Sequence, residues 1–230
     1  MDPRQKQTLS EIQSPGLITP EFVKGCIKIV NCNIRLGEVE AAREMINITN
    51  NLGNIPNTSA LCQAMVSGAR AQEDNITRLE ELEQEGMEAL KSKQFSQGIE
   101  IIDKALLIAG SCLRLKMARG DCLAHLGRYV EGAKAASSIL QQDQRNTGAL
   151  FLRGFCLYHK NNIDRAVTHF SQVLQINRDH ERAKTLLNKA KAFKEKREQA
   201  SKANLEKRYQ TAENILSEAL KIDPKNKVRK

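Results

Sequence analysis

The residues of this chain that could carry chemistry are six cysteines and four histidines, because thiolates and imidazoles serve as metal ligands and nucleophiles. Their spacing favours neither use. The sequence contains no two cysteines separated by two residues, and no HExxH motif. Cys122 and Cys156 each lie two residues after a glycine, at Gly120 and Gly154, where cysteine serves as a small core residue. We therefore expect reduced, buried thiols, no metal site and no cofactor.

The elements that would position these residues are set by a repeat. Gly86, Gly120 and Gly154 follow one another at intervals of 34 residues (120 − 86 and 154 − 120). The segments 119–123 and 153–157 match as RGDCL and RGFCL. A period of this length is that of the tetratricopeptide repeat (TPR), in which two antiparallel helices, A and B, pack closely at small residues. The sequence therefore predicts an all-α fold: a right-handed TPR solenoid of antiparallel helix pairs with two lengthened connecting helices.

The spacing also predicts how the chain is divided. Val30 takes the place of the glycine in a degraded unit, and the distance from it to Gly86 exceeds one period. After His180 the helical pattern runs on unbroken to about Tyr209, which lengthens the connection to the last unit. The predicted segments are a mobile tail (1–20), a degenerate TPR unit (21–56), a connecting helix (57–78), three regular TPR units (79–180), a helix extension (181–192), a terminal TPR unit (193–226) and a basic tail (227–230).

Composition limits the class of protein. An apolar content of 40% in 230 residues supports a buried core. We find no apolar run of membrane-spanning length and no signal-peptide core, so we expect a protein of the cytoplasm, or of the nucleus. The net charge of +9 comes mainly from residues 181–230. This basic region is either a solvated helix face or a surface that attracts acidic partners or phosphates.

A stripe of residues on the predicted A helices marks a candidate binding surface, because A helices line the concave face of a TPR array. Methionine and aromatic side chains there suit an apolar or amphipathic peptide helix. The alternative is that the lengthened helix after His180 folds back and covers the stripe as core, and the sequence leaves both open. The predicted groove residues are Met87 and Leu90 in the first regular unit, Met117 and Asp121 in the second, and Phe151, Phe155 and Tyr158 in the third.

The likeness to known proteins is closer than to a generic TPR. The segment 113–129, LRLKMARGDCLAHLGRY, resembles the central repeats of the TPR-containing J-domain co-chaperones of the Hsp40 type. The segments FVKG at 22–25, RGFCLY at 153–158 and ALKIDP at 219–224 are similar to the same family, in the same order. The resemblance covers about residues 21–226. It implies a role in moving client proteins between the Hsp seventy and Hsp ninety chaperones.

Two departures from that family bear on function. The His-Pro-Asp triplet of the J domain does not occur in this sequence. The resemblance also implies a carboxylate clamp, in which Lys, Asn and Arg side chains from three successive units hold the acidic tail of a chaperone. Only partial clamp remnants are present: Lys24 and Lys28 stand at third-unit positions, and Arg197 and Ser201 at first-unit positions. The chain therefore resembles the middle of such a co-chaperone, cut at both ends.

The sequence thus predicts a non-enzymatic protein–protein interaction module that binds apolar or amphipathic peptide segments in its concave groove. The expected partners are proteins, such as Hsp seventy and Hsp ninety chaperones or their clients, with little affinity for an acidic chaperone tail. Three alternatives stay open. They are an enzyme whose site assembles only in three dimensions, a phosphate- or nucleic-acid-associated scaffold that uses the basic C-terminal helix, and a truncated decoy of the full co-chaperone.

Overall fold

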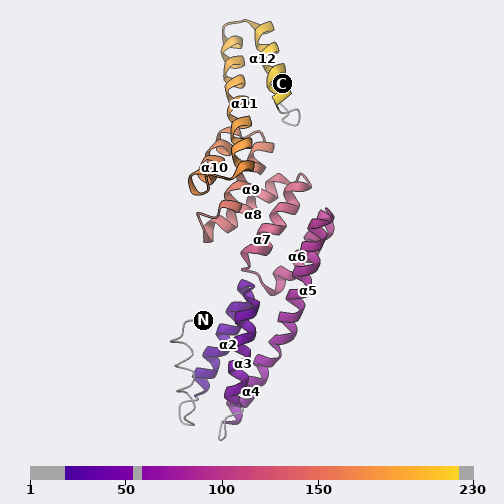
Figure 1. Cartoon of the computed structure of the whole chain (residues 1–230), viewed down its shortest axis with the longest axis vertical. Coiled ribbons are helices and arrows are strands. Elements are labelled where there is room, and N and C mark those ends of the chain that lie inside the picture. The colour runs from indigo at the N-terminus through magenta and orange to yellow at the C-terminus, as the bar shows by residue number, and fades with distance from the viewer. Residues whose placement is uncertain (1–18, 54–58, 223–230) are drawn as a thin grey trace. The chain divides into compact units, whose positions relative to one another are not determined.

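The computed structural model describes residues 19–53 and 59–222, and these two ranges fold into α-helices without a strand (Figure 1). The predicted basic tail at 227–230 and most of the predicted mobile tail lie outside the described residues. In chain order the helices are α2 (Pro20–Leu36), α3 (Val39–Gly53), α4 (Ala60–Arg70), α5 (Gln72–Lys91), α6 (Phe95–Ile108), α7 (Leu113–His125), α8 (Tyr129–Gln142), α9 (Thr147–His159), α10 (Ile163–Ile176), α11 (Glu181–Leu205) and α12 (Tyr209–Ile222).

The predicted period appears as helix pairs of equal length. The B helices α6, α8 and α10 each contain 14 residues and begin at Phe95, Tyr129 and Ile163, which are again 34 residues apart (129 − 95 and 163 − 129). The terminal B helix, α12, has the same length of 14 residues. Each B helix therefore starts in the same register of the repeat, although the sequences of the four helices differ.

The turns inside the helix pairs share one geometry. Two residues before each B helix the backbone is left-handed, with φ from 58° to 76°, and the residue's N–H donates to the carbonyl three places back. The next N–H donates to the carbonyl five places back, and these two bonds satisfy the last carbonyls of helix A. Glycine adopts this conformation without strain, whereas lysine does not. The left-handed residues are Gly37, Lys93, Gly127, Asn161 and Lys207.

The repeated small residues have a packing cause. A Cβ placed on Gly154 of α9 would lie 2.8 Å from a ring carbon of Phe170 in α10. A Cβ placed on Gly132 of α8 would lie 2.9 Å from the Sγ of Cys156 in α9. Helices in contact at these points have no room for a methyl group, so glycine and cysteine recur there.

The chain forms two compact units. The first unit contains residues 1–88 and 100–115, and the second unit contains residues 89–99 and 116–230. In the first unit α2 begins earlier than predicted. The Thr19 hydroxyl accepts a hydrogen bond of 3.2 Å from the N–H of Phe22, and Pro20 stands in the first turn. Residues 19 and 20 were predicted to belong to the mobile tail, and instead they start the helix.

The predicted connecting helix at 57–78 is two helices in the structure. The Ser59 hydroxyl caps α4 by accepting from the N–H of Cys62, and α4 ends one residue before Ala71. The longer helix α5 starts directly after Ala71. Helix α4 packs Cys62 and Val66 against Val23 of α2, so this segment completes the first unit as well as linking it to the regular repeats.

In the second unit the longest helix, α11, runs for 25 residues from Glu181 to Leu205. Its residues Leu187, Ala190 and Phe193 join a core cluster in which Tyr158 and Phe170 are also buried. The predicted helix extension at 181–192 and the first helix of the predicted terminal unit therefore lie on this one helix. Its N-terminal half provides core for the pair α9–α10.

Candidate peptide-binding groove

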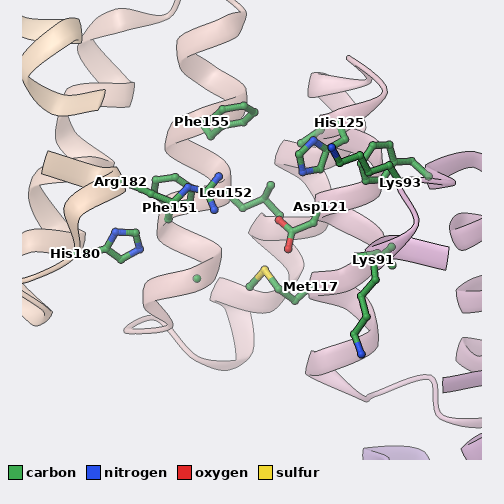
Figure 2. A pocket seen from close by; sticks show the side chains of 14 residues that line it. Lys91, Lys93, Met117, Asp121, His125, Phe151, Leu152, Phe155, His180 and Arg182 are labelled. Atoms are coloured by element: carbon green, nitrogen blue, oxygen red, sulfur yellow. The ribbon is translucent and has the colours of Figure 1, made fainter. Parts of the chain in front are cut away.

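A groove with a volume of about 530 Å³ opens in the second unit. Helices α7 and α9 form its floor, the residues around the α5–α6 turn form one rim, and the start of α11 forms the other (Figure 2). Its apolar lining consists of Leu90, Phe95, Met117, Ala124, Phe151, Leu152 and Phe155, with Gly148 beside Met117. Its charged and polar lining consists of Lys91, Lys93, Asp121, His125, His180 and Arg182.

The aromatic side chains of α9 form a continuous surface along the groove. The Phe151 and Phe155 rings lie 6.3 Å apart, and Phe151 stacks on His180 at 5.0 Å between ring centroids. The Arg182 guanidinium lies 5.0 Å from the centre of the Phe151 ring, a cation–π contact. Both phenylalanines are half-buried. Packing within the groove therefore holds both rings, while part of each side chain stays accessible.

The carboxylate of Asp121 is the acidic group of the groove, and it points toward the space between Met117 and Leu152 (Figure 2). It makes no hydrogen bond or ion pair with any other described residue. Burial raises the pKa of the Asp121 carboxyl, and the charges of His125 and Arg182 lower it by less. An ionised carboxylate held in this apolar setting lacks the partner that buried charges require.

Five of the seven predicted groove residues meet in this groove: Leu90, Met117, Asp121, Phe151 and Phe155. Met87 does not line it. Met87 belongs to the first unit and is exposed on α5.

The prediction for Tyr158 is wrong. Its side chain is 1% exposed and packs in the core cluster with Phe170 and Phe193. The alternative interpretation of the stripe, in which the helix after His180 folds back and covers it, therefore holds for Tyr158. It does not hold for Phe155, whose ring lies against Tyr129 and His159. It holds in part for Phe151, which packs against core clusters containing Ala183 and Leu187 of α11 and is half-buried.

The partial clamp remnants do not gather into a site. Lys24 and Lys28 are exposed on α2 in the first unit. Arg197 donates a hydrogen bond of 3.3 Å to the Asp164 carboxylate, which also pairs with Lys194 at 2.7 Å. Ser201 and Arg197 line a second hollow of about 580 Å³, between α11 and α12.

The groove residues that were not predicted include the rim residues, Phe95 among them, and Ala124, Gly148 and Leu152 on the floor. Arg182 was not predicted because residues 181–192 were interpreted as a helix extension outside any repeat. Arg182 follows Gly148 by one period (182 − 148 = 34), so the regular spacing would have placed it in the groove.

The cysteines and histidines have packing roles. Five thiols are buried as predicted, whereas Cys32 is exposed, so the prediction of a buried thiol is wrong for Cys32. Burial, and to a smaller extent the charge of Asp121, raise the pKa of Cys122 to about 11 and that of Cys156 to about 12. Both thiols are therefore poor nucleophiles. No group of three His, Cys, Asp or Glu residues within 19–53 and 59–222 is placed to hold a metal ion.

The repeat also recurs in ring contacts. His125 stacks on Phe95 at 4.4 Å, and one period later His159 stacks on Tyr129 at 4.9 Å (159 − 125 and 129 − 95 are both 34). The two histidines thus occupy equivalent positions of the repeat, and each packs its ring on the first residue of a B helix. Among the described helices, none is both long and apolar enough to cross a membrane.

Comparison with known proteins identifies the fold. The model of the tetratricopeptide repeat family matches residues 123–190. The crystal structure of the P58(IPK) TPR domain superposes with a TM-score of 0.71 at 16% identity, covering 88% of this chain and 55% of that one. The predicted all-α TPR solenoid is therefore confirmed.

The comparisons also identify relatives in sequence. DnaJ homolog subfamily C member 7 from Homo sapiens is 33% identical over 225 residues, 97% of this chain and 43% of the relative. Its homolog from Dictyostelium discoideum is 27% identical over 205 residues, 89% of this chain and 36% of the relative. The chain thus spans less than half the length of these relatives. The predicted resemblance to the TPR region of J-domain proteins is confirmed.

Proposed function

From the premise that the chain is a TPR protein homologous to DnaJ homolog subfamily C member 7 along nearly its whole length, we propose that it is a non-enzymatic cytoplasmic adaptor of the chaperone system. Its groove binds apolar or amphipathic peptide segments of partner proteins. These partners are chaperones or the client proteins that they handle. Cytoplasmic location is supported by the six unpaired cysteines, which suit a reducing compartment.

The observation that carries this proposal is the half-buried aromatic surface of α9, which lines the groove. Phe151 and Phe155 of α9 line an open groove together with Met117 of α7. Tyr158, also on α9, is instead covered by α11. Apolar side chains that stay accessible in a concave site are typical of peptide-binding surfaces. Methionine and aromatic side chains add adaptable contact area for a helical or extended peptide.

Recognition of an acidic chaperone tail through a clamp is not supported by the charges of the second unit. A clamp acts through desolvated, charge-assisted hydrogen bonds to a terminal carboxylate. Arg197 is already paired with Asp164, and Asp121 brings a negative charge into the groove. We expect calorimetry to detect no salt-resistant binding of an acidic C-terminal chaperone peptide.

Binding of phosphate or nucleic acid by the basic α11 finds no support in its contacts. Lys194 pairs with Asp164, and Lys196 pairs with Glu218 at 2.6 Å. Paired cations attract phosphates less, because part of their field is cancelled. A filter-binding titration across salt separates the two functions, and retention of nucleic acid at moderate salt would support the scaffold instead.

The experiment that tests the adaptor function is capture of peptides on an array of apolar and amphipathic sequences by wild type and Phe155→Ala. Loss of an anchoring aromatic costs about 2 kcal/mol of binding, which weakens capture about thirtyfold. The matched control is Leu107→Ala, because Leu107 is 87% exposed on α6 and lies outside the groove. Equal capture by wild type and Phe155→Ala would refute the groove as the binding site.

A further inference from the structure

Asp121 departs from the apolar pattern of its repeat position. One period before it stands Met87 and one period after it stands Phe155 (121 − 87 and 155 − 121 are both 34). All three occupy the same place on an A helix. The Asp121 side chain at this position faces the centre of the groove, and its apolar neighbours there are Met117 and Leu152 (Figure 2).

The protein itself provides Asp121 with no direct partner among its described residues. His125 and Arg182 act on it through their charges, and no hydrogen bond joins either of them to its carboxylate. Burial nevertheless disfavours its ionised form. A carboxylate in this state gains most from a cationic donor brought into the groove, since an ion pair removed from water is screened little.

The cations around the groove contribute less than Asp121 to the choice of ligand. Lys91, Lys93 and Arg182 are exposed, and water and salt screen charges of that kind. Arg182 already lies over the Phe151 ring. An acidic ligand would gain weak attraction at these rims and would meet the Asp121 carboxylate at the centre. A wholly apolar ligand would bury that carboxylate without a partner, which costs binding energy.

We propose that the groove selects peptide segments that combine apolar side chains with one central lysine or arginine, whose charged group pairs with Asp121. This inference rests on the proposed function and names the chemistry of the partner. The apolar residues of the segment lie on Met117, Phe151 and Phe155. Its cation reaches the carboxylate between them, and acidic side chains near the centre are excluded by like charge.

The test uses three synthetic peptides that share one apolar sequence of Leu, Met and Phe and differ only in the central residue, which is Lys, norleucine or Glu. All are acetylated and amidated, so no terminal charge competes. Fluorescence anisotropy with the full chain measures their affinities. A charge-assisted hydrogen bond is worth about 1.4 kcal/mol or more, so the Lys peptide should bind at least about tenfold more tightly than the norleucine peptide. The Glu peptide should bind most weakly.

Two variants test whether Asp121 causes the preference for the Lys peptide. Asp121→Asn removes the charge with little change of shape, and the preference for Lys over norleucine should fall to about onefold. Glu100→Gln makes the same change of net charge at an exposed position on α6, and it should retain the full preference. The comparison of peptides on wild type stands even if a variant fails to fold.

The outcomes distinguish failure of the groove function from failure of the pairing with Asp121. If none of the three peptides binds, the groove function fails and this inference fails with it. If the Lys and norleucine peptides bind wild type equally, the groove function stands and pairing with Asp121 is refuted. Tightest binding by the Glu peptide would assign selection to Lys91, Lys93 and Arg182, and would also overturn the inference.

Discussion

Helix α9 presents aromatic residues to two different surroundings. On its core face Tyr158 is buried with Phe170 and Phe193. On its groove face Phe151 and Phe155 are half-buried and line the groove. The residue types are alike on the two faces, so the difference arises from what α11 places against each. Local sequence makes a face apolar, and the following helix decides whether that face becomes core or binding surface.

The largest effect is expected on the core face. Phe193→Ala leaves a cavity in the core cluster that contains Tyr158 and Phe170, and Phe→Ala changes in a core cost about 3–5 kcal/mol. Chemical denaturation should show this loss in the free energy of unfolding. Phe193→Leu fills most of the volume and should recover the larger part. A loss below about 1 kcal/mol for Phe193→Ala would mean that α11 does not cover Tyr158.

The same truncation on the groove face should cost far less stability. Phe155 is half-buried, lies edge-to-face with Tyr129 and His159 at ring distances of 6.4 and 4.5 Å, and packs against a core cluster that includes the small residues Ala136 and Cys156. We expect Phe155→Ala to lower the free energy of unfolding by about 1 kcal/mol, measured by the same denaturation. If it destabilises the protein as much as Phe193→Ala does, the two faces are equivalent and Phe155 is core.

A smaller effect comes from the charge in the groove and depends on pH. Because the pKa of Asp121 is raised in the folded state, its ionisation lowers the stability of wild type as the pH rises from its ordinary pKa of about 4 through the raised pKa. Asp121→Asn carries no such charge. Its melting temperature relative to wild type should therefore rise with pH over that window and stay constant above it. Calorimetry between about pH 3 and pH 8 measures the difference.

The opposite result would be informative as well. A variant Asp121→Asn that is less stable than wild type at neutral pH would show that the carboxylate holds the fold. The His125 and Arg182 charges, which partly offset burial, would then have to act as its partners.

The smallest effect concerns the rim of the groove. Lys93 is left-handed, which costs an L-residue about 1–2 kcal/mol, whereas glycine adds about 0.5–1 kcal/mol of unfolded-state entropy. Lys93→Gly should therefore stabilise the protein by about 0.5 kcal/mol, seen as a slightly higher denaturation midpoint. Gly127→Ala, at the equivalent turn one period later, is the matched reverse and should destabilise. Loss of peptide capture in Lys93→Gly would show that the Lys93 side chain on the rim contributes to the peptide affinity.

Much of this arrangement could be predicted because it repeats. The interval between glycines predicted the helix pairs, since a Cβ at Gly154 has no room beside Phe170. Tyr158 could not be assigned correctly, because its cover, Phe193, belongs to a helix of 25 residues, which is longer than the helices of 13 and 14 residues in the regular repeat. The break at Ala71 gave no signal either, because alanine favours a helix and the Ala71 backbone itself stays in the right-handed helical region.

The most direct test of the groove is a titration of protein labelled with ¹³C at its methionine methyl groups, using the peptide with the central lysine. Met117 lies on the groove floor, whereas Met45 and Met65 pack against core clusters of the first unit. The Met117 methyl resonance should shift on binding, and those of Met45 and Met65 should stay in place. A saturable peptide complex in which the Met117 resonance does not move would contradict the account.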